Sequence, residues 1–361
     1  MRVGILIYGD IASQSGGYLY DRQLVNCLQQ QGDTVEIFSL PFQPYSKAIF
    51  NQYDLNKVVN TKLDVLIQDE LVHASVYRSN QQFIRQTGIP VAGLVHLFSA
   101  YADQPLHRRL LLRYTERAYI NTVNGLILNS NNSLQQAKSL IGGNNMPPHL
   151  VAVPAGNNFG NVQIPETAKL TSKSAPLKLL YVGNVIRQKG LHLILHAMQR
   201  LPKNRFTLTV AGRLDMEPDY VNRIRQTIVD LNLCDQVKIT GPLDREPLAI
   251  IYQSHHLFVL PSVNEAYGIV YVEAQQFGLP AIATTAGGAR EIISDGETGY
   301  LIKPGDITTL TKLLNTLNDD RQLLQALGTN ALNAYRQHPA WDDTGKQIRN
   351  FLHQLISPRE N

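Results

Sequence analysis

Residues 257–306 read LFVLPSVNEAYGIVYVEAQQFGLPAIATTAGGAREIISDGETGYLIKPGD, and this stretch decides the fold. The apolar run at its start predicts a buried strand that ends at Pro261, and the residues from Gly268 to Phe277 predict a helix. A strand that passes through a short loop into a helix is the repeating unit of a doubly wound parallel sheet. In such sheets ligands bind at the carboxyl ends of the strands. Binding residues are therefore expected in the loop between Pro261 and Gly268.

Two glutamates flank the start of this helix. Glu265 lies in the loop, and Glu273 lies two turns further on, within the helix. Gly268 has no side chain, so the first amide groups of the helix are open to a phosphate. Glu273 offers two acceptor oxygens that can reach the hydroxyls of a ribose. The alternative is that both glutamates are solvated side chains of a loop and a helix.

The same alternation of strands and helices runs outward through the chain, and 361 residues are enough for two domains. Strands are expected at 2–8, 34–39, 64–67, 90–95, 125–128 and 150–154, and then at 178–182, 206–211, 236–240, 257–260, 281–284 and 300–302. Helices are expected most clearly at 18–31, 107–121, 131–140, 191–200, 218–231, 268–277, 307–317, 321–337 and 341–356. The predicted fold class is therefore α/β, with two Rossmann-like domains built on parallel sheets.

A polar segment without sustained periodicity divides the two halves. We expect an N-terminal domain at 1–156, a linker at 157–176 and a C-terminal domain at 177–340, followed by a last helix within 341–361.

The composition is that of an ordered globular protein, with 43% apolar and 17% charged residues. The net charge of +4 falls short of what nucleic-acid binding requires. Cys27 and Cys234 lie among leucines and are expected to be buried, without a disulfide or a zinc site. The N-terminus has no signal-peptide pattern and no stretch is long and apolar enough to span a membrane, so we expect a cytoplasmic protein.

The stretch 257–306 resembles the nucleotide-sugar half of retaining glycosyltransferases of the two-Rossmann-domain (GT-B) type. Within this type it is similar to glycosyltransferase family 4. The family's pair of glutamates stands here as EAYGIVYVE, from Glu265 to Glu273, and is followed by FGLP, by two glycines before Glu291 and by DGETGYLI from Asp295. The resemblance implies two facing domains, an N-terminal one for the acceptor and a C-terminal one for the nucleotide sugar. It also implies that the last helix crosses back to the N-terminal domain.

The resemblance assigns roles to the residues of this motif. It implies that Glu273 binds the ribose hydroxyls, that the amides near Ile269 and Val270 meet the donor diphosphate, and that Glu265 faces the transferred sugar.

A second match is LLYVGNVIRQKGLHLILHAM, which starts at Leu179 and runs from a strand through Gly183 into a helix. The family has an arginine after this glycine and a lysine before the next one, and both bind the donor diphosphate. Lys189 fits the lysine position, whereas Asn184 stands where the arginine is expected. Arg187, in the same loop, is a candidate for the missing charge. The alternative is that both cations are solvated side chains of the loop.

Three further positions match less specific features of the family. Arg213, in VAGRLD, is a candidate donor contact or a surface arginine. Gly16 and Gly17 stand before the first helix, where close approach of a phosphate is expected, although YGDIASQSGG is not the fingerprint of an NAD or FAD enzyme. His96 ends a predicted strand, where the family carries a histidine near the sugar; alone, such a histidine is more often structural.

Two features of the N-terminal half stay open. Asp69 and Glu70 also end a strand and are candidates for acceptor contacts, or for capping a turn. The helix at 107–119 carries Arg108, Arg109 and Arg113 among leucines. It either places one face in the core and its arginines in water, or contacts the inner face of an anionic membrane.

The resemblance implies transfer of a sugar from a nucleoside-diphosphate donor with retention, to an acceptor that is a glycan, a lipid or a small molecule. We expect no cofactor and no catalytic metal, because the chain has no Asp-x-Asp triplet and Lys189 with helix amides can stabilise the leaving diphosphate. The alternatives are an epimerase or phosphorylase on the same fold, and a non-catalytic nucleotide-sugar-binding protein.

Overall fold

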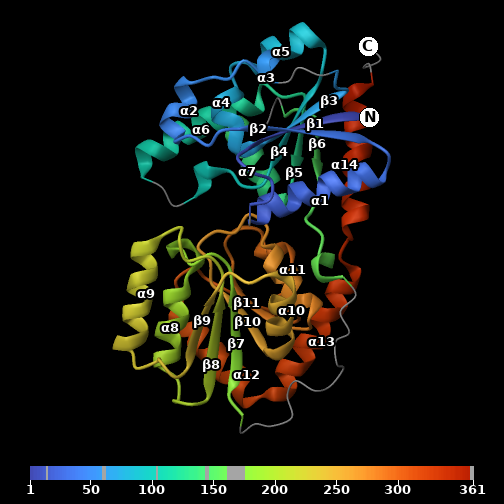
Figure 1. Ribbon diagram of the computed structural model, residues 1–361. Coiled ribbons are helices and arrows are strands. Elements are labelled where there is room, and N and C mark those ends of the chain that lie inside the picture. The colour runs from blue at the N-terminus through green and yellow to red at the C-terminus, as the bar shows by residue number, and fades with distance from the viewer. Residues whose placement is uncertain (14, 59–61, 103–104, 143–145, 161–174, 358–361) are drawn as a thin grey trace. The chain divides into compact units, whose positions relative to one another are not determined.

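The computed structural model describes residues 1–13, 15–58, 62–102, 105–142, 146–160 and 175–357. The chain divides into two compact units, unit 1 (Met1–Pro154 with Pro339–Asn361) and unit 2 (Ala155–His338). Figure 1 shows that helices flank a sheet in each unit.

Unit 1 contains a parallel six-stranded sheet in the order β2-β1-β3-β4-β5-β6. Its strands are β1 (Arg2–Tyr8), β2 (Thr34–Leu40), β3 (Val65–Asp69), β4 (Val91–Val95), β5 (Gly125–Leu128) and β6 (His149–Val151). Its helices are α1 (Gly16–Gln30), α2 (Tyr45–Phe50), α3 (Leu55–Val58), α4 (His73–Val76), α5 (Asn80–Thr87), α6 (Leu106–Ile120), α7 (Asn131–Ile141) and α14 (Trp341–Ile356), with short 3-10 turns η1 (Glu70–Val72) and η2 (Ser99–Tyr101).

Helix α14 packs within unit 1 against α1 and the sheet. The Cys27 thiol of α1 donates a hydrogen bond of 3.3 Å to the carbonyl of Trp341, and the rings of Tyr20 and Trp341 meet edge to face at 5.3 Å. At Gly125 of β5 an added Cβ would lie only 2.7 Å from the side chain of Leu355, so this glycine allows α14 to approach the strand.

Unit 2 contains a second parallel six-stranded sheet, in the order β12-β11-β10-β7-β8-β9. Its strands are β7 (Leu177–Val182), β8 (Phe206–Ala211), β9 (Val237–Gly241), β10 (Leu257–Leu260), β11 (Ala281–Thr284) and β12 (Gly299–Ile302). Its helices are α8 (Leu191–Gln199), α9 (Pro218–Asp230), α10 (Arg245–Ser254), α11 (Ile269–Gln276), α12 (Ile307–Asp319) and α13 (Arg321–Gln337), with 3-10 turns η3 (Asn157–Phe159), η4 (Arg187–Lys189) and η5 (Gly287–Glu291).

These two parallel sheets confirm the predicted fold class. Strands β7, β10 and β11 are almost entirely buried and consist of apolar residues except for Lys178 and Thr284, as is typical of strands covered on both faces. The expected bounds of β5, β8, β10, β11, α13 and α14 match those of the structure residue for residue.

Two observations bear on the other expectations. Cys234 is exposed and not buried, because it lies in the turn between α9 and β9, where Leu233 and not the cysteine points into the core. Most of the expected linker, residues 161–174, lies outside the described residues. The flanking residues 157–160 and 175–176 lie in unit 2.

Each sheet has one point at which the order of the strands reverses. In unit 2 the chain proceeds from β7 outward to β9 and then returns to β10, which pairs with β7 through Leu257 and Leu179. In unit 1 the reversal falls between β1 and β3. Loops that leave these neighbouring strands diverge to opposite faces of the sheet, and ligands bind in the crevice between them.

Candidate functional site

Lys189 and Glu265 meet at the reversal point of unit 2. Lys189 follows β7 and Glu265 follows β10, and the Lys189 ammonium donates hydrogen bonds to both carboxylate oxygens, with 2.6 Å to Oε2. The two side chains are 19% and 11% exposed, so the ion pair is largely but not completely shielded from water. The structure thus brings together two of the residues that the sequence singled out.

Backbone contacts fix the two loops to each other. The amide of Val263 donates to the carbonyl of Gln188 (2.8 Å), and the Gln188 side chain donates to the carbonyl of Asn264 (3.0 Å). Gly190 has a φ of +72°, and an added Cβ would lie 2.4 Å from the carbonyl oxygen of Pro261. Glycine is required at this position for both its backbone angle and its closeness to the neighbouring loop.

The glycine pair after β11 holds the backbone of Glu265. The amide of Gly288 donates to the carbonyl of Glu265 at 2.7 Å, and a Cβ at Gly287 would lie 2.0 Å from the same oxygen. This contact explains why two glycines stand at this distance from the EAYGIVYVE segment. The position of the Glu265 carboxylate is therefore set by three loops that follow β7, β10 and β11.

Helix α11 begins directly after this loop. Gly268, at its N-cap, has a φ of +94° and provides no side chain that could cap the helix. The first amides of a helix have no partner within the helix, so those of Ile269 and Val270 are suited to an anion. Both residues are only partly buried.

Glu273 lies one turn further along α11 and is almost completely buried. Its Oε1 accepts a hydrogen bond from the Asn158 amide (2.9 Å), and its Oε2 accepts one from the Tyr252 hydroxyl (3.1 Å). Burial raises the pKa of Glu273 to about 7, against the opposing effect of these two hydrogen bonds. Phe159 and Phe277 pack against the ring of Tyr252 and complete the surroundings.

The remaining donor-site candidates lie in loops next to the ion pair. Arg187 is exposed, and its backbone amide donates to Glu217 (3.0 Å). The loop of Gly183 and Asn184 is joined to the next strand's loop, because the amide of Val185 donates to the carbonyl of Arg213 (2.9 Å). The Arg213 guanidinium forms a two-point ion pair with Asp215 on the surface (3.0 and 2.7 Å). No contact of these side chains with Glu265 is found within the described residues.

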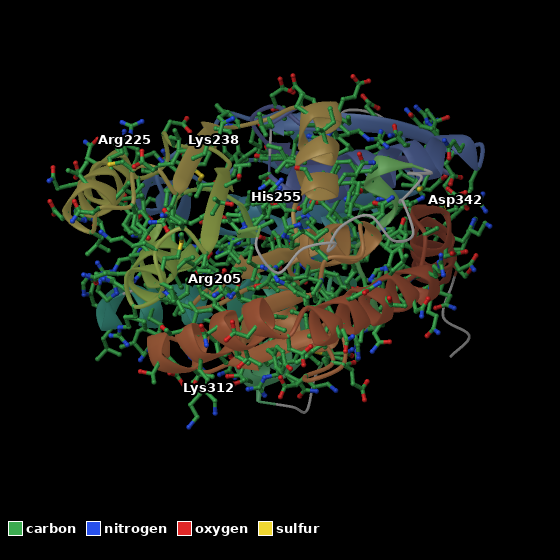
Figure 2. All side chains as sticks on the ribbon, turned by 90° about the horizontal axis from the view of Figure 1, so that it is seen from below. Arg205, Arg225, Lys238, His255, Lys312 and Asp342 are labelled. Atoms are coloured by element: carbon green, nitrogen blue, oxygen red, sulfur yellow. The ribbon has the colours of Figure 1, made fainter. Side chains whose placement is uncertain are left out.

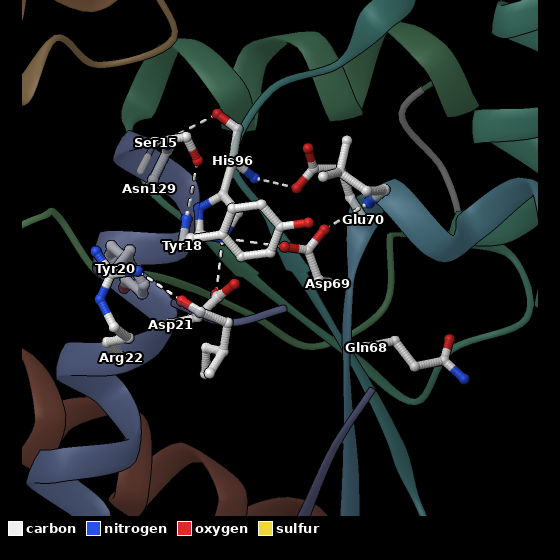
Figure 3. A network of polar contacts seen from close by, with 12 residues as sticks. Ser15, Tyr18, Tyr20, Asp21, Arg22, Gln68, Asp69, Glu70, His96 and Asn129 are labelled. Atoms are coloured by element: carbon white, nitrogen blue, oxygen red, sulfur yellow. Dashed lines mark hydrogen bonds and ion pairs between the residues drawn. The ribbon is translucent and has the colours of Figure 1, made fainter. Parts of the chain in front are cut away.

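At the reversal point of unit 1 lies a group of buried polar residues, Asp21, Asp69, Glu70 and His96, which we call the His96 cluster (Figure 3). The His96 Nε2 lies 2.9 Å from Asp21 Oδ1 and 3.7 Å from Asp69 Oδ2. Its backbone amide donates to Glu70 Oε2 (2.7 Å), and its carbonyl accepts from Asn129 (2.7 Å). Two carboxylates therefore lie within 3.7 Å of the imidazole Nε2, and a third binds the backbone of the same residue.

Burial and the neighbouring charges shift the pKa values of His96, Asp69 and Glu70. Burial alone would lower the pKa of His96, but the charge and hydrogen bond of Asp21, with the charges of Glu70 and Asp69, raise it to about 10. Burial and the neighbouring carboxylates raise the pKa of Asp69 well above its usual range, and burial raises that of Glu70 to about 7. Such shifted groups at a strand-end crevice are typical of functional sites.

Sequence reasoning found His96, Asp69 and Glu70 but missed Asp21. A signal was present, because Asp21 occupies the face of α1 that Leu24, Val25 and Leu28 bury. An acidic residue at a core position of a helix is rare unless it has a partner. Gly17, expected beside a phosphate, packs against His96, since an added Cβ would lie 3.1 Å from the imidazole Cδ2. Gly16 begins α1 in the same loop.

Helix α6 exposes apolar side chains next to its arginines. Leu106, Leu110 and Tyr114 follow one another at intervals of four residues, so they share one helix face, and they are 62%, 58% and 65% exposed. The only acid of the helix is Glu116, which is buried and whose pKa burial raises to about 8. The surface of α6 is therefore both apolar and cationic.

The chain is similar to proteins named as glycosyltransferases. A model of the family described as "Glycosyl transferases group 1" matches residues 163–334. The chain is 30% identical over 175 residues to a sulfoquinovosyl transferase of Arabidopsis thaliana, which covers 48% of this chain and 32% of that protein. It is 24% identical over 311 residues to a D-inositol 3-phosphate glycosyltransferase of Corynebacterium efficiens, which covers 81% of this chain and 72% of that protein.

Solved structures share the fold over nearly the whole chain. A sucrose-phosphate synthase from Thermosynechococcus elongatus has a TM-score of 0.84 at 21% identity, with 98% of this chain and 99% of that chain covered. HepE of Anabaena, in complex with UDP and glucose, has a TM-score of 0.75 at 20% identity, with 98% and 99% covered. At these identities the likeness shows the fold.

Proposed function

The chain belongs, through the match over residues 163–334, to the group 1 glycosyltransferases, and we propose that it transfers a sugar from a nucleoside-diphosphate donor to an acceptor hydroxyl with retention of configuration. The observation that carries this proposal is the convergence of Lys189, Glu265 and the start of α11 at the reversal point of the unit 2 sheet.

The donor binds along this edge of the sheet. Its diphosphate contacts the Lys189 ammonium and the amides of Ile269 and Val270, which together offer a positive charge and a helix N-terminus. Its ribose hydroxyls donate to Glu273. Glu265 then faces the sugar that is transferred, and Arg187 contributes the cation that Asn184 does not supply. Arg213 and Gly183 line the neighbouring loop.

The reaction needs only the donor, the acceptor and the residues that contact the donor. The bond between the anomeric carbon and the leaving phosphate oxygen breaks, and the diphosphate keeps the electron pair. The acceptor hydroxyl attacks the same face of the sugar, and its proton passes to the departing phosphate oxygen. Lys189 and the helix amides stabilise the charge that develops on the diphosphate, and Glu265 stabilises the positive charge on the sugar ring. The transfer proceeds without a metal ion or cofactor.

Unit 1 receives the acceptor, and His96 has a catalytic role in this proposal. The HepE structure, which contains UDP and glucose, supports a nucleotide sugar as the donor. The acceptor is a glycan, a lipid or a small molecule.

A second proposal is peripheral contact of α6 with an anionic bilayer. Leu106, Leu110 and Tyr114 are exposed on one face of α6. Arg108 and Arg109 are exposed residues of the same helix. Apolar side chains can enter the interfacial region while arginines bind anionic headgroups. Helix α2 adds Phe50, which is 79% exposed, and is joined to α6 by the hydrogen bond between Tyr45 and Thr115. Among the described residues no helix is long and apolar enough to cross a membrane.

A thermal-shift screen with UDP-, GDP- and ADP-glucose tests the donor half of the proposal, because a ligand that binds only the folded protein raises its Tm. The stabilising donor is then incubated with acceptor pools and the products are identified. A glycosylated product supports the proposal. An isomerised nucleotide sugar or a sugar phosphate would instead indicate an epimerase or a phosphorylase, and binding without any turnover would indicate a non-catalytic binding protein.

A further inference from the structure

The imidazole of His96 is held on several sides. Asp21 binds the ring Nε2 at 2.9 Å, and Glu70 accepts a hydrogen bond from the backbone amide of His96 at 2.7 Å. The ring of Tyr20 packs edge to face against the imidazole at 5.3 Å. The backbone of Gly17 also lies against the ring, because an added Cβ there would be 3.1 Å from its Cδ2. A ring with so many contacts has little freedom to rotate.

The second ring nitrogen of His96, Nδ1, is not part of this network. It has no hydrogen-bond partner among the described residues. It is also not fully buried, so water can reach it. The side chain is 11% exposed, so Nδ1 is the nitrogen that a ligand can reach. In Figure 3, dashed lines join Nε2 to both Asp21 and Asp69.

The position of Asp21 is unfavourable for the stability of the fold. It is completely buried in α1, and its Oδ2 has no hydrogen-bond partner within the described residues. A buried carboxylate with a single strong partner destabilises a fold relative to an apolar residue of similar size. Local violations of this kind occur mainly where a function requires them.

We propose that Asp21 is a positioning residue for His96: by binding Nε2 it fixes the ring so that Nδ1–H is presented as a hydrogen-bond donor to an oxygen atom of the sugar substrate. The identity of the ligand rests on the proposed function, whereas the relation between Asp21 and His96 does not.

The charged groups around the ring favour the imidazolium, in which Nδ1 is a hydrogen-bond donor and not an acceptor. The groups that face it are Asp21 from α1, Asp69 at the end of β3 and Glu70 from η1, and all three favour the imidazolium. Arg22, the neighbouring base in the sequence, donates instead to the carbonyls of the loop before α1. An imidazolium carries a proton on both nitrogens, so in this state His96 is a hydrogen-bond donor and not the general base that deprotonates the acceptor.

The test follows the ring nitrogens of His96 by NMR, in full-length protein labelled with ¹⁵N-histidine. A His96→Gln variant assigns the signal, and spectra are recorded from pH 6 to pH 10 for wild type, Asp21→Asn and Asp64→Asn. Asp64 is a matched control, because it is an exposed carboxylate of the same unit that binds the backbone of Arg2. We expect both nitrogens of wild-type His96 to stay protonated at pH 8, and the Asp21→Asn ring to lose a proton at lower pH.

The result that overturns the proposal is a neutral His96 ring in the wild type at pH 7, or an unchanged titration in Asp21→Asn. Unfolding of Asp21→Asn would be seen in the rest of the spectrum, and Asp21→Glu, which keeps the charge, then serves as the second variant. A merely structural Asp21 would also move the His96 titration when it is replaced, so the titration tests the ion pair and the kinetic readout tests the positioning role.

A kinetic readout separates this inference from the proposed function. With the donor that thermal shift identifies, Asp21→Asn should lower kcat at least ~10-fold while the donor Kd changes less than ~3-fold. Asp64→Asn should leave both unchanged. If kcat is unaffected, Asp21 does not position a reacting group. If wild-type protein turns over no donor, the proposed function fails, while the NMR titration still decides on Asp21 and His96.

Discussion

The Lys189 ammonium donates to both carboxylate oxygens of Glu265, although the two residues are 76 positions apart in the chain. A donor diphosphate that approaches Lys189 has to compete with this carboxylate. Binding of the donor is therefore expected to exchange one anionic partner of the lysine for another and to free Glu265 to face the sugar.

The first prediction concerns Lys189. Replacing it with methionine removes charge-assisted hydrogen bonds to the diphosphate, so the affinity for the donor should fall by ~1.5–3 kcal/mol, or roughly 10- to 150-fold. Isothermal titration with the nucleoside diphosphate measures the change. Lys203→Met, at an exposed lysine of the same unit, is the control and should bind like wild type. Equal affinities for both variants would show that Lys189 does not bind the diphosphate.

The second prediction concerns Glu265. The Glu265→Gln variant keeps the size of the side chain and loses its charge, which is needed mainly when positive charge develops on the sugar ring. We expect kcat to fall at least ~100-fold with little change in donor affinity. Steady-state turnover and donor titration, measured together, separate the two effects. Full transferase activity in this variant would remove Glu265 from the mechanism.

The third prediction concerns the ribose contact. Glu273→Ala should weaken binding of the nucleotide itself by ~1.5–3 kcal/mol, because a charge-assisted contact to the ribose hydroxyls is lost. Comparing a nucleoside diphosphate with its 2′,3′-dideoxy analogue sharpens the test. Wild type should bind the analogue more weakly, and Glu273→Ala should bind both alike. A variant that still distinguishes them would place the ribose elsewhere.

The fourth prediction is a pH dependence of the same contact. Burial raises the pKa of Glu273 to about 7, so the free protein carries a proton there below that pH. Ribose hydroxyls favour the carboxylate, and binding must then release the proton, which weakens affinity as pH falls. Between pH 8 and pH 6 the nucleotide affinity of wild type should drop on the order of tenfold more than that of Glu273→Gln. Both proteins share the titration of the phosphate, so parallel curves would contradict the prediction.

The fifth prediction addresses the membrane. Wild type should float with vesicles of anionic phospholipid at low salt and less so at moderate salt, whereas the Arg108, Arg109 and Arg113→Glu triple variant should not float. The control changes the same number of charges at Arg225, Lys238 and Lys312, which are exposed on unit 2 (Figure 2). If wild type does not float, or the control loses binding equally, α6 is not the contact surface.

Much of the fold could be predicted from the sequence, and the omissions have physical causes. Strands β5, β10 and β11 are largely apolar runs and β8 alternates threonine with apolar residues, and turn residues bound them, so their limits are encoded locally. Helices such as α3 and α4 have four residues each, too few to show a helical period. Helix α10 carries a proline in its first turn, which obscures its helical pattern in the sequence.

The candidate site was predicted in its members but not in its contacts. Glu265 and Glu273 could be predicted because they flank the start of a helix that follows a strand end, and Lys189 because its segment resembles that of the family. Asn158 and Tyr252, which hold Glu273, were missed, because nothing near either residue in the sequence connects it to α11.

The sequence by itself determined the two parallel sheets and the loops that carry polar residues at their carboxyl ends, because apolar periodicity and glycine positions act over a few neighbouring residues. Only the tertiary structure decided which charges meet. Lys189 reaches Glu265 because β7 and β10 are neighbours in the sheet, and Asp21 reaches His96 because α1 passes the end of β4. Such pairs depend on strand order, which is set by the burial of the whole sheet and not by any local stretch of the chain.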